Sequence, residues 1–131
     1  MQFTRTSFGL STVSATVENQ LSLIYFNINR CEEAHQHLDR ARRIHVSLKD
    51  AGTVAQVDET RATVFLKQGR IRKAEEAARA AVYQQEKTGR YLLIAEALIT
   101  HGRALARLKR YGAALIAFRR AGRLGRVYRQ H

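Results

Sequence analysis

Residues 101–126 read HGRALARLKRYGAALIAFRRAGRLGR, a stretch that mixes apolar residues with arginines and contains no acidic residue. Leu105 and Leu108 precede Lys109 and Arg110, and Leu115 and Phe118 follow them, at steps of three and seven residues. Such steps place side chains on one face of a helix. The stretch therefore predicts two helices joined by a tight turn.

The same pattern recurs every 40 residues. Seven columns agree in type when the chain is written in rows of 40, namely Val17, Val57 and Ala97; Ser22, Ala62 and Gly102; Ile24, Val64 and Ala104; Tyr25, Phe65 and Leu105; Arg30, Arg70 and Arg110; Ala34, Ala74 and Ala114; and Ala41, Ala81 and Ala121. Each row predicts one helical hairpin, and one hairpin cannot bury its apolar face alone. We expect the alanine columns to mark close helix crossings, the first within a hairpin and the second against the next.

Turn and cap residues mark the ends of the predicted helices. Asn29, Gly69 and Lys109 stand at the turn of each row. Asn29 followed by Glu32, and Thr53 followed by Gln56, are typical of helix N-caps.

These residues resemble the tetratricopeptide repeat (TPR), whose pattern places a small and an aromatic residue on the first helix and alanines seven apart on the second. The matching residues are Leu21, Ser22, Tyr25, Ala34, Leu38 and Ala41 in row one; Ala62, Phe65, Ala74, Ala78 and Ala81 in row two; and Gly102, Leu105, Tyr111, Ala114, Phe118 and Ala121 in row three. The family's tryptophan place holds Glu18, Asp58 and Leu98, and its closing proline is missing. A period of 40 rather than 34 is similar to the TPR-like segments of bacterial signalling and transcription-regulator proteins.

The resemblance implies an all-α, right-handed α-solenoid of about three hairpins over residues 14–126, with repeats at 14–52, 53–89 and 90–126. Residues 1–13 form an N-terminal segment, for which the tail of an earlier repeat is one interpretation, and residues 127–131 form a tail. A polar capping helix is missing after Gly125, so the last apolar face is expected to be bare. Self-association through that end and membership of a longer array are both open.

Composition agrees with a helical, soluble domain. The chain has 131 residues, 45% of them apolar, with no proline, no tryptophan and the single cysteine Cys31. No apolar run reaches signal-peptide or membrane-spanning length. One cysteine also excludes an internal disulfide framework. We therefore predict a cytoplasmic protein.

No residue pattern indicates catalysis, a metal site or a cofactor. His35 and His37, two residues apart, point about 200° apart on a helix and cannot share a metal ion. His101 and Cys31 fall at packing positions, which indicates buried residues without chemistry. Phosphate loops and nucleophile motifs are absent from the sequence. We predict that the chain is not an enzyme.

The resemblance places function on the concave face, where the first helix of each repeat lines a groove for a peptide or protein. The positions carried over are Asn19, Leu23, Phe26, Asn27, Glu59, Thr63, Leu66, Lys67, Ile99, Arg103 and Arg107. They predict a groove that is polar and apolar in row one and cationic in row three. The residue set with which some family members clamp a C-terminal carboxylate is not matched. A solvated face without a ligand is the alternative.

Positive charge gathers in the last third of the chain. The formal net charge is +12, and residues 90–131 hold ten basic and one acidic side chain. Outside the groove, the predicted basic surface consists of Arg110, Arg119, Arg120, Arg123 and Arg126. Arginine pairs with both carboxylate and phosphate, so an acidic partner, a phosphate backbone and a missing acidic neighbour all stay open. We predict a protein-interaction scaffold in a bacterial signalling or regulatory assembly, with a basic nucleic-acid-associated protein as the alternative.

Overall fold

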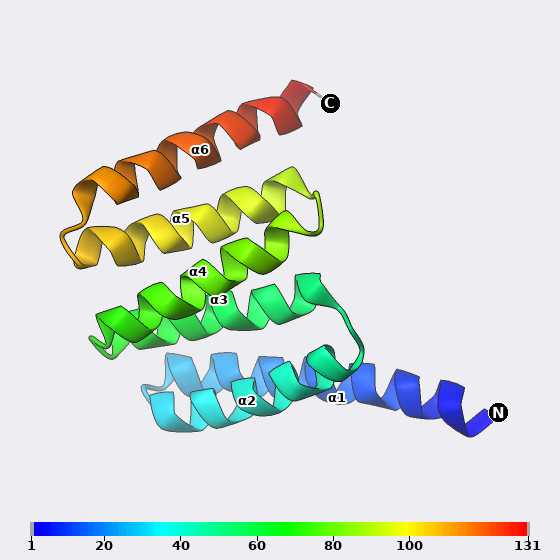
Figure 1. The fold of residues 1–131 in the computed structure, drawn as a ribbon. Helices are drawn as coiled ribbons and strands as arrows, with labels where there is room; N and C mark the ends of the chain where they lie inside the picture. The colour runs from blue at the N-terminus through cyan, green and yellow to red at the C-terminus, as the bar shows by residue number, and fades with distance from the viewer. Residues whose placement is uncertain (1, 131) are drawn as a thin grey trace.

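Six helices stack as three antiparallel hairpins (Figure 1). The computed structural model describes the backbone of residues 2–130 and the side chains of residues 13–127 and 129. Within these residues the elements are α1 (Gln2–Asn27), α2 (Cys31–Ser47), α3 (Ala51–Lys67), α4 (Ile71–Glu86), α5 (Tyr91–Arg107) and α6 (Tyr111–Gln130), without a strand. The hairpins α1–α2, α3–α4 and α5–α6 follow one another along the stack, and the two chain ends lie at its opposite ends (Figure 1). The prediction of an all-α solenoid is confirmed.

The 40-residue period is also the period of the helices. The second helices begin at Cys31, Ile71 and Tyr111, and the first helices end at Asn27, Lys67 and Arg107. In the structure α1 extends back through the predicted N-terminal segment to Gln2, and α6 continues through the predicted tail to Gln130.

The three hairpin turns share one backbone geometry. Asn29, Gly69 and Lys109 adopt positive φ angles of 66°, 75° and 64°. At each turn the amide of the following arginine donates to a carbonyl in the last turn of the preceding helix, as Arg110 N does to Leu105 O at 2.9 Å. This is the Schellman ending of a helix, in which the left-handed residue stops the helix and satisfies its last carbonyls.

Two cap predictions were wrong. Asn29 ends α1 instead of capping α2, whose N-cap is Arg30 and has no side-chain cap hydrogen bond. The cap of α3 is Asp50, whose carboxylate accepts from the Thr53 amide at 3.2 Å. Asparagine suits both left-handed turns and N-caps, so its residue type alone does not separate the two.

Small residues of the repeat are buried between the helices. All six residues of the two alanine columns are buried, with at most 6% of their surface exposed. In the third hairpin, Phe118 fills the space over Gly102, where an added Cβ would lie 2.7 Å from the Phe118 ring. The equivalent pairs in the other hairpins are Ser22 with Leu38 and Ala62 with Ala78. Among the three hairpins, the smallest residue at this position of the first helix, Gly102, therefore faces the largest residue at the matching position of the second helix, Phe118.

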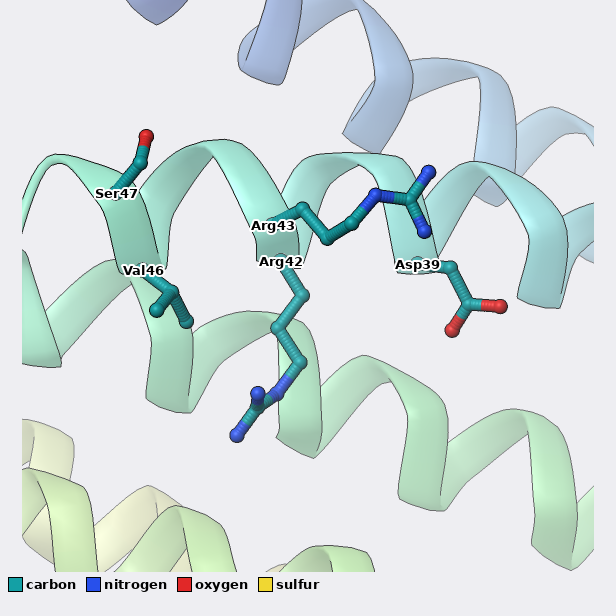
Figure 2. A pocket seen from close by; sticks show the side chains of 5 residues that line it. All are labelled: Asp39, Arg42, Arg43, Val46 and Ser47. Atoms are coloured by element: carbon teal, nitrogen blue, oxygen red, sulfur yellow. The ribbon is translucent and has the colours of Figure 1, made fainter.

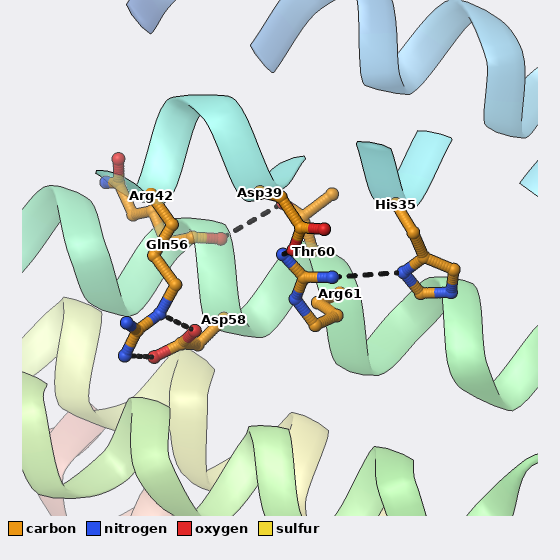
Figure 3. Close-up of polar contacts among 7 residues, drawn as sticks. All are labelled: His35, Asp39, Arg42, Gln56, Asp58, Thr60 and Arg61. Carbon is orange, nitrogen blue, oxygen red and sulfur yellow. Dashed lines mark hydrogen bonds and ion pairs between the residues drawn. The ribbon is translucent and has the colours of Figure 1, made fainter. Parts of the chain in front are cut away.

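A polar network joins the first hairpin to the second (Figure 3). Arg42 on α2 donates to both carboxylate oxygens of Asp58 on α3, at 2.7 and 3.3 Å, and only 6% of the Asp58 side chain is exposed. The hydrogen bond to Asp58 raises the pKa of Arg42, so the guanidinium keeps its charge in this buried contact. Nearby, Arg61 donates to Asp39 at 2.7 Å.

His35 completes this network as a neutral side chain. Burial lowers the pKa of His35. Its Nε2 donates to Gln68 Oε1 at 2.7 Å, which leaves Nδ1 to accept from Arg61 at 3.3 Å. All of these bonds cross from α2 to α3 or to Gln68, the C-cap of α3, so they fix how the two hairpins meet.

The joint between the second and third hairpins uses the same columns with different side chains. Val82 and Leu98 stand at the columns of Arg42 and Asp58, and both are buried. His101 Nε2 donates to Glu75 at 2.7 Å, where the first joint has Arg61 and His35. His101 was expected to be partly buried because of its packing position, and the structure confirms that it is half-buried.

We predict that glycine at the turn column stabilises the fold. Lys109→Gly relieves the left-handed strain and is expected to raise the free energy of unfolding by about 1 kcal/mol, whereas Gly69→Lys lowers it by a similar amount. Urea unfolding monitored by circular dichroism measures both. Lys73→Gly, inside α4, is the matched control and destabilises. Equal effects of glycine at positions 109 and 73 would contradict the assignment.

We also predict that the first joint tolerates the side chains of the second. Arg42→Val leaves the buried Asp58 carboxylate unpaired and costs about 3 kcal/mol of unfolding free energy. The double variant Arg42→Val/Asp58→Leu recreates the Val82 and Leu98 pair and is expected to recover most of that loss. Thermal and urea unfolding of the wild type, both single variants and the double variant give the coupling. Additive losses would show that the two columns do not meet.

Candidate functional site

The eleven predicted groove positions lie on α1, α3 and α5, the first helix of each hairpin. None of the eleven is buried. Phe26 and Leu66 are half-buried, while Leu23 and Ile99 expose 37% and 36% of their surface. The face combines apolar area with charged ends, which suits binding better than packing. We call the exposed side of α1, α3 and α5 the groove face.

A hollow of about 260 Å³ lies on this face between α3 and α5. Its lining is rich in hydrogen-bond acceptors and consists of Gln56, Glu59, Thr60, Thr63 and Glu96. Burial raises the pKa of Glu59, a hydrogen bond from Thr100 lowers it, and the nearby Glu96 carboxylate raises it again. Among the described residues, no cationic side chain forms an ion pair with either glutamate. The hollow therefore presents two carboxylates without a positive partner.

The acceptor character extends to α1. Asn19 stands in the same column as Glu59, and its Oδ1 is buried without a hydrogen-bond donor among the described residues. Its backbone carbonyl accepts from the Ser22 hydroxyl at 2.6 Å. Acceptors from three successive hairpins thus lie along this part of the groove face, and the one on Asn19 is buried.

Cationic side chains occupy the other end of the same helices. Lys67 donates to the Phe26 carbonyl at 3.0 Å and stands 4.3 Å from the centre of the Phe26 ring, so it bridges α3 and α1. Arg103 and Arg107 are exposed on α5, and neither of them forms an ion pair with another described residue. At 1.5 Å per residue, Glu96 and Arg107 are separated by about 16 Å along α5, and Glu59 and Lys67 by about 12 Å along α3.

Beside the predicted cationic residues Arg103 and Arg107, the third row also carries an acidic residue, Glu96, in the first half of α5. Glu96, Gln56 and Thr60 were missed because only positions matching the family's groove were carried over. The available signal was helical spacing, since Glu96 lies three residues before the predicted Ile99 on the same face. Charge on the groove face consequently changes along the helix axes rather than from repeat to repeat.

The predicted basic surface is divided between paired and unpaired arginines. Arg120 donates to Glu86 on α4 at 2.6 Å, so its charge is compensated. Arg119, Arg123 and Arg126 are exposed on α6 without an ion pair among the described residues. Arg110 precedes α6 and lines a hollow of about 330 Å³ with Arg72, Glu75, Glu76 and Leu108.

Another hollow lies away from every predicted site residue. Its volume is about 530 Å³, and Figure 2 shows its lining, all from α2: Asp39, Arg42, Arg43, Val46 and Ser47. Arg42 and Asp39 already pair with side chains of α3. Arg43 is the lining cation left without an ion pair among the described residues. A surface formed by one helix holds a ligand weakly, so we assign no function to it.

Neither a cluster of metal-ligating side chains nor a membrane-spanning helix occurs among the described residues. No three histidine, cysteine, aspartate or glutamate side chains gather there to hold a metal ion. His37 contacts Glu18 and stacks on Tyr25 at 5.1 Å, apart from His35. Cys31 is a half-buried free thiol. None of the described helices has the length and hydropathy of a membrane span.

Comparison with known proteins places the fold. No family model matches the chain, and no curated protein matches it significantly. Among solved structures, BtubC (BKLC) from P. vanneervenii superposes with a TM-score of 0.83 at 16% identity, over 89% of this chain and 48% of BtubC. The N-terminal domain of stress-induced protein-1 (STI-1) from C. elegans gives 0.74 at 23% identity, over 87% of this chain and 86% of that domain.

The fold is a TPR-like α-solenoid. This chain spans about half the length of BtubC. At 16% and 23% identity, the superpositions show that the TPR-like hairpins are arranged alike. They do not extend to the side chains of the groove face.

We predict that the Glu59 charge destabilises the folded protein at neutral pH. The folded state holds the Glu59 proton more tightly than the unfolded chain, so this contribution to stability falls as pH rises through the glutamate range. Glu59→Gln keeps an oxygen for Thr100 and is expected to raise the free energy of unfolding at pH 7. The gain disappears below about pH 4, where both states are protonated.

Urea unfolding between pH 3.5 and 8 measures this difference. Glu76→Gln is the matched control, because Glu76 is exposed on α4 and its pH dependence is expected to follow the wild type. A Glu59→Gln variant less stable than the wild type at pH 7 would show that the carboxylate is already compensated.

Proposed function

We propose that the protein is a non-catalytic interaction scaffold whose groove face binds a peptide segment of a protein partner. The observation that carries this proposal is the pair Glu59 and Glu96, which lack a cation, at one end of a face whose other end carries Arg103 and Arg107. Such unpaired charges on one exposed face are suited to a complementary partner. A cytoplasmic bacterial signalling or regulatory assembly, expected from the long repeat, is the setting that we propose for it.

The charge arrangement defines the kind of segment that fits. A lysine or arginine enters the hollow at Glu59 and Glu96, and an aspartate, glutamate or carboxyl terminus reaches Arg103 and Arg107. Measured from Glu59 to Lys67 on α3 and from Glu96 to Arg107 on α5, the two ends are about 12 to 16 Å apart. An extended chain covers that distance in about four or five residues. The partner segment therefore carries opposite charges at that spacing.

Apolar contact supplies the rest of the binding free energy. Leu66 and Ile99 lie between the two charged ends, and Leu23 and Phe26 continue the apolar area onto α1. Exposed ion pairs contribute little each, so these side chains provide affinity while the charges select the sequence. The proposed segment has an apolar residue between its two charged ones.

A second candidate is binding to a nucleic-acid backbone. The observation that favours it is the row of unpaired arginines on α6, Arg119, Arg123 and Arg126. Phosphate binding through these residues would weaken steeply between low and moderate salt. The acid pair of the groove face gives such a ligand no attraction, so the two candidates use different residues.

We predict that selection from a random peptide library enriches segments with a basic and an acidic residue four or five positions apart. Fluorescence anisotropy of a selected peptide then measures affinity. Glu59→Gln/Glu96→Gln and Arg103→Gln/Arg107→Gln are each expected to weaken binding about tenfold, since each removes two exposed ion pairs. Arg119→Gln/Arg123→Gln is the matched control, with affinity unchanged.

Two outcomes would contradict this function. Selection of peptides without the charge pattern would remove the role of the groove face. Binding of labelled DNA or RNA that Arg119→Gln/Arg123→Gln abolishes, in the absence of any selected peptide, would support the nucleic-acid function instead.

A further inference from the structure

The first helix exposes a continuous apolar stripe on its outer face. Its side chains are between 37% and 60% exposed and consist of Val13, Val17, Leu21, Ile24 and Ile28. Steps of four, four, three and four residues keep them on one side of α1. The stripe is separate from the groove positions Asn19, Leu23, Phe26 and Asn27. An apolar row of this length is unusual on a surface that faces only water.

The repeat shows what covers this stripe elsewhere in the molecule. The equivalents of Val17 and Ile24 are Val57 and Val64 on α3, and Ala97 and Ala104 on α5, each at most 2% exposed. In those positions the second helix of the preceding hairpin packs against them. Leu38 on α2, for example, belongs to the same core cluster as Val57 and Val64.

The last helix exposes the complementary surface. Leu115 and Phe118 on α6 are 50% and 38% exposed. Their equivalents on α2 are His35 and Leu38, at 8% and 0%, and on α4 they are Glu75 and Ala78, at 8% and 0%. Those side chains are buried because the next hairpin covers them. The outer side of α6 is therefore the surface that such a hairpin takes.

Placing α1 against α6 in the register of the internal joints matches apolar with apolar. In the first joint, His35 occupies the column of Leu115. It bonds to Arg61 and Gln68, which occupy the columns of Leu21 and Ile28. In the second joint the column of Leu115 meets the column of Leu21 again, through Glu75 and His101. In the internal joints these columns therefore pair polar side chains with polar ones. Between α6 and α1 the same columns would pair Leu115 with Leu21 and Ile28.

We propose that two copies of this chain associate head to tail, with α6 of one copy packed against α1 of the next, so that the stack of hairpins continues from copy to copy. Leu115 contacts Leu21 and Ile28, and Phe118 contacts Val17 and Ile24. A second copy is the occupant that the register favours, because both matching faces belong to this chain. Such a contact is heterologous and leaves one face free at each end, so oligomers grow with concentration.

Net charge sets the salt dependence of this contact. Each copy carries a formal charge of +12, so copies repel one another at low ionic strength. The joint itself is apolar and is not weakened by salt. We expect association to strengthen between 50 and 500 mM salt as the repulsion is screened, opposite to the behaviour of a contact made by the α6 arginines.

We predict that a charged side chain on either face stops association. Mixing the two variants leaves one intact face on each, so one contact forms and the product is a heterodimer. Leu115→Glu blocks α6 and keeps α1, whereas Leu21→Lys blocks α1 and keeps α6. In sedimentation velocity at increasing protein concentration, the wild type forms a series of oligomers, each variant alone is monomeric, and the equimolar mixture forms a heterodimer that grows no further. Ile116→Glu is the control, since Ile116 is 65% exposed away from the joint columns, and it associates like the wild type.

Three results would overturn the proposal. They are a wild type that stays monomeric across the concentration range in high salt, a mixture that forms no dimer, and a Leu115→Glu variant that still associates alone. Circular dichroism of both variants establishes that they remain folded, as expected for changes on outward faces. Peptide binding by the groove face is measured on the same variants, so loss of association leaves the test of the proposed function intact.

Discussion

Close approach of helix backbones at small residues is the constraint on which this structure depends. Helices that cross through large side chains stay farther apart, whereas alanine or glycine at a crossing lets the ridges of one helix enter the grooves of the other. The buried alanine columns provide that approach in all three hairpins, and Gly102 under Phe118 shows how little room is left. A repeated crossing keeps the hairpins in one orientation, and that orientation aligns α1, α3 and α5 into one face.

The joints between hairpins keep this geometry with different chemistry. The first joint is held by buried polar bonds and the second by Val82, Leu98 and the Glu75 and His101 pair. Buried ion pairs contribute little net stability against apolar side chains of similar volume, but they tolerate only a narrow geometry. Different side chains at equivalent columns distinguish one joint from the other, so each hairpin has a preferred neighbour. By the same criterion, the outer side of α6 matches the outer side of α1.

Much of the fold could be predicted from the sequence because the chain repeats its packing residues at a fixed interval. Turn positions followed from Asn29, Gly69 and Lys109, although Asn29 was given the wrong role, since asparagine favours both caps and left-handed turns. Burial was less predictable: Val17 and Ile24 share columns with core residues yet are exposed, because no hairpin of the described chain lies beyond α1. The site was predicted in part, as Glu96 matters only through its distance from Glu59, and such distances across helices are not written in a single sequence.

Distances between equivalent positions test the linear stack most directly. Gln36, Glu76 and Ile116 are exposed and occupy one column of the three hairpins. After Cys31 is replaced by serine, pairs of spin labels at these positions give three distances by pulsed electron–electron double resonance. A linear stack predicts similar distances for 36 to 76 and 76 to 116, with 36 to 116 approaching their sum. Three similar distances would mean a closed bundle, in which neither a continuous groove face nor matching outer faces exist.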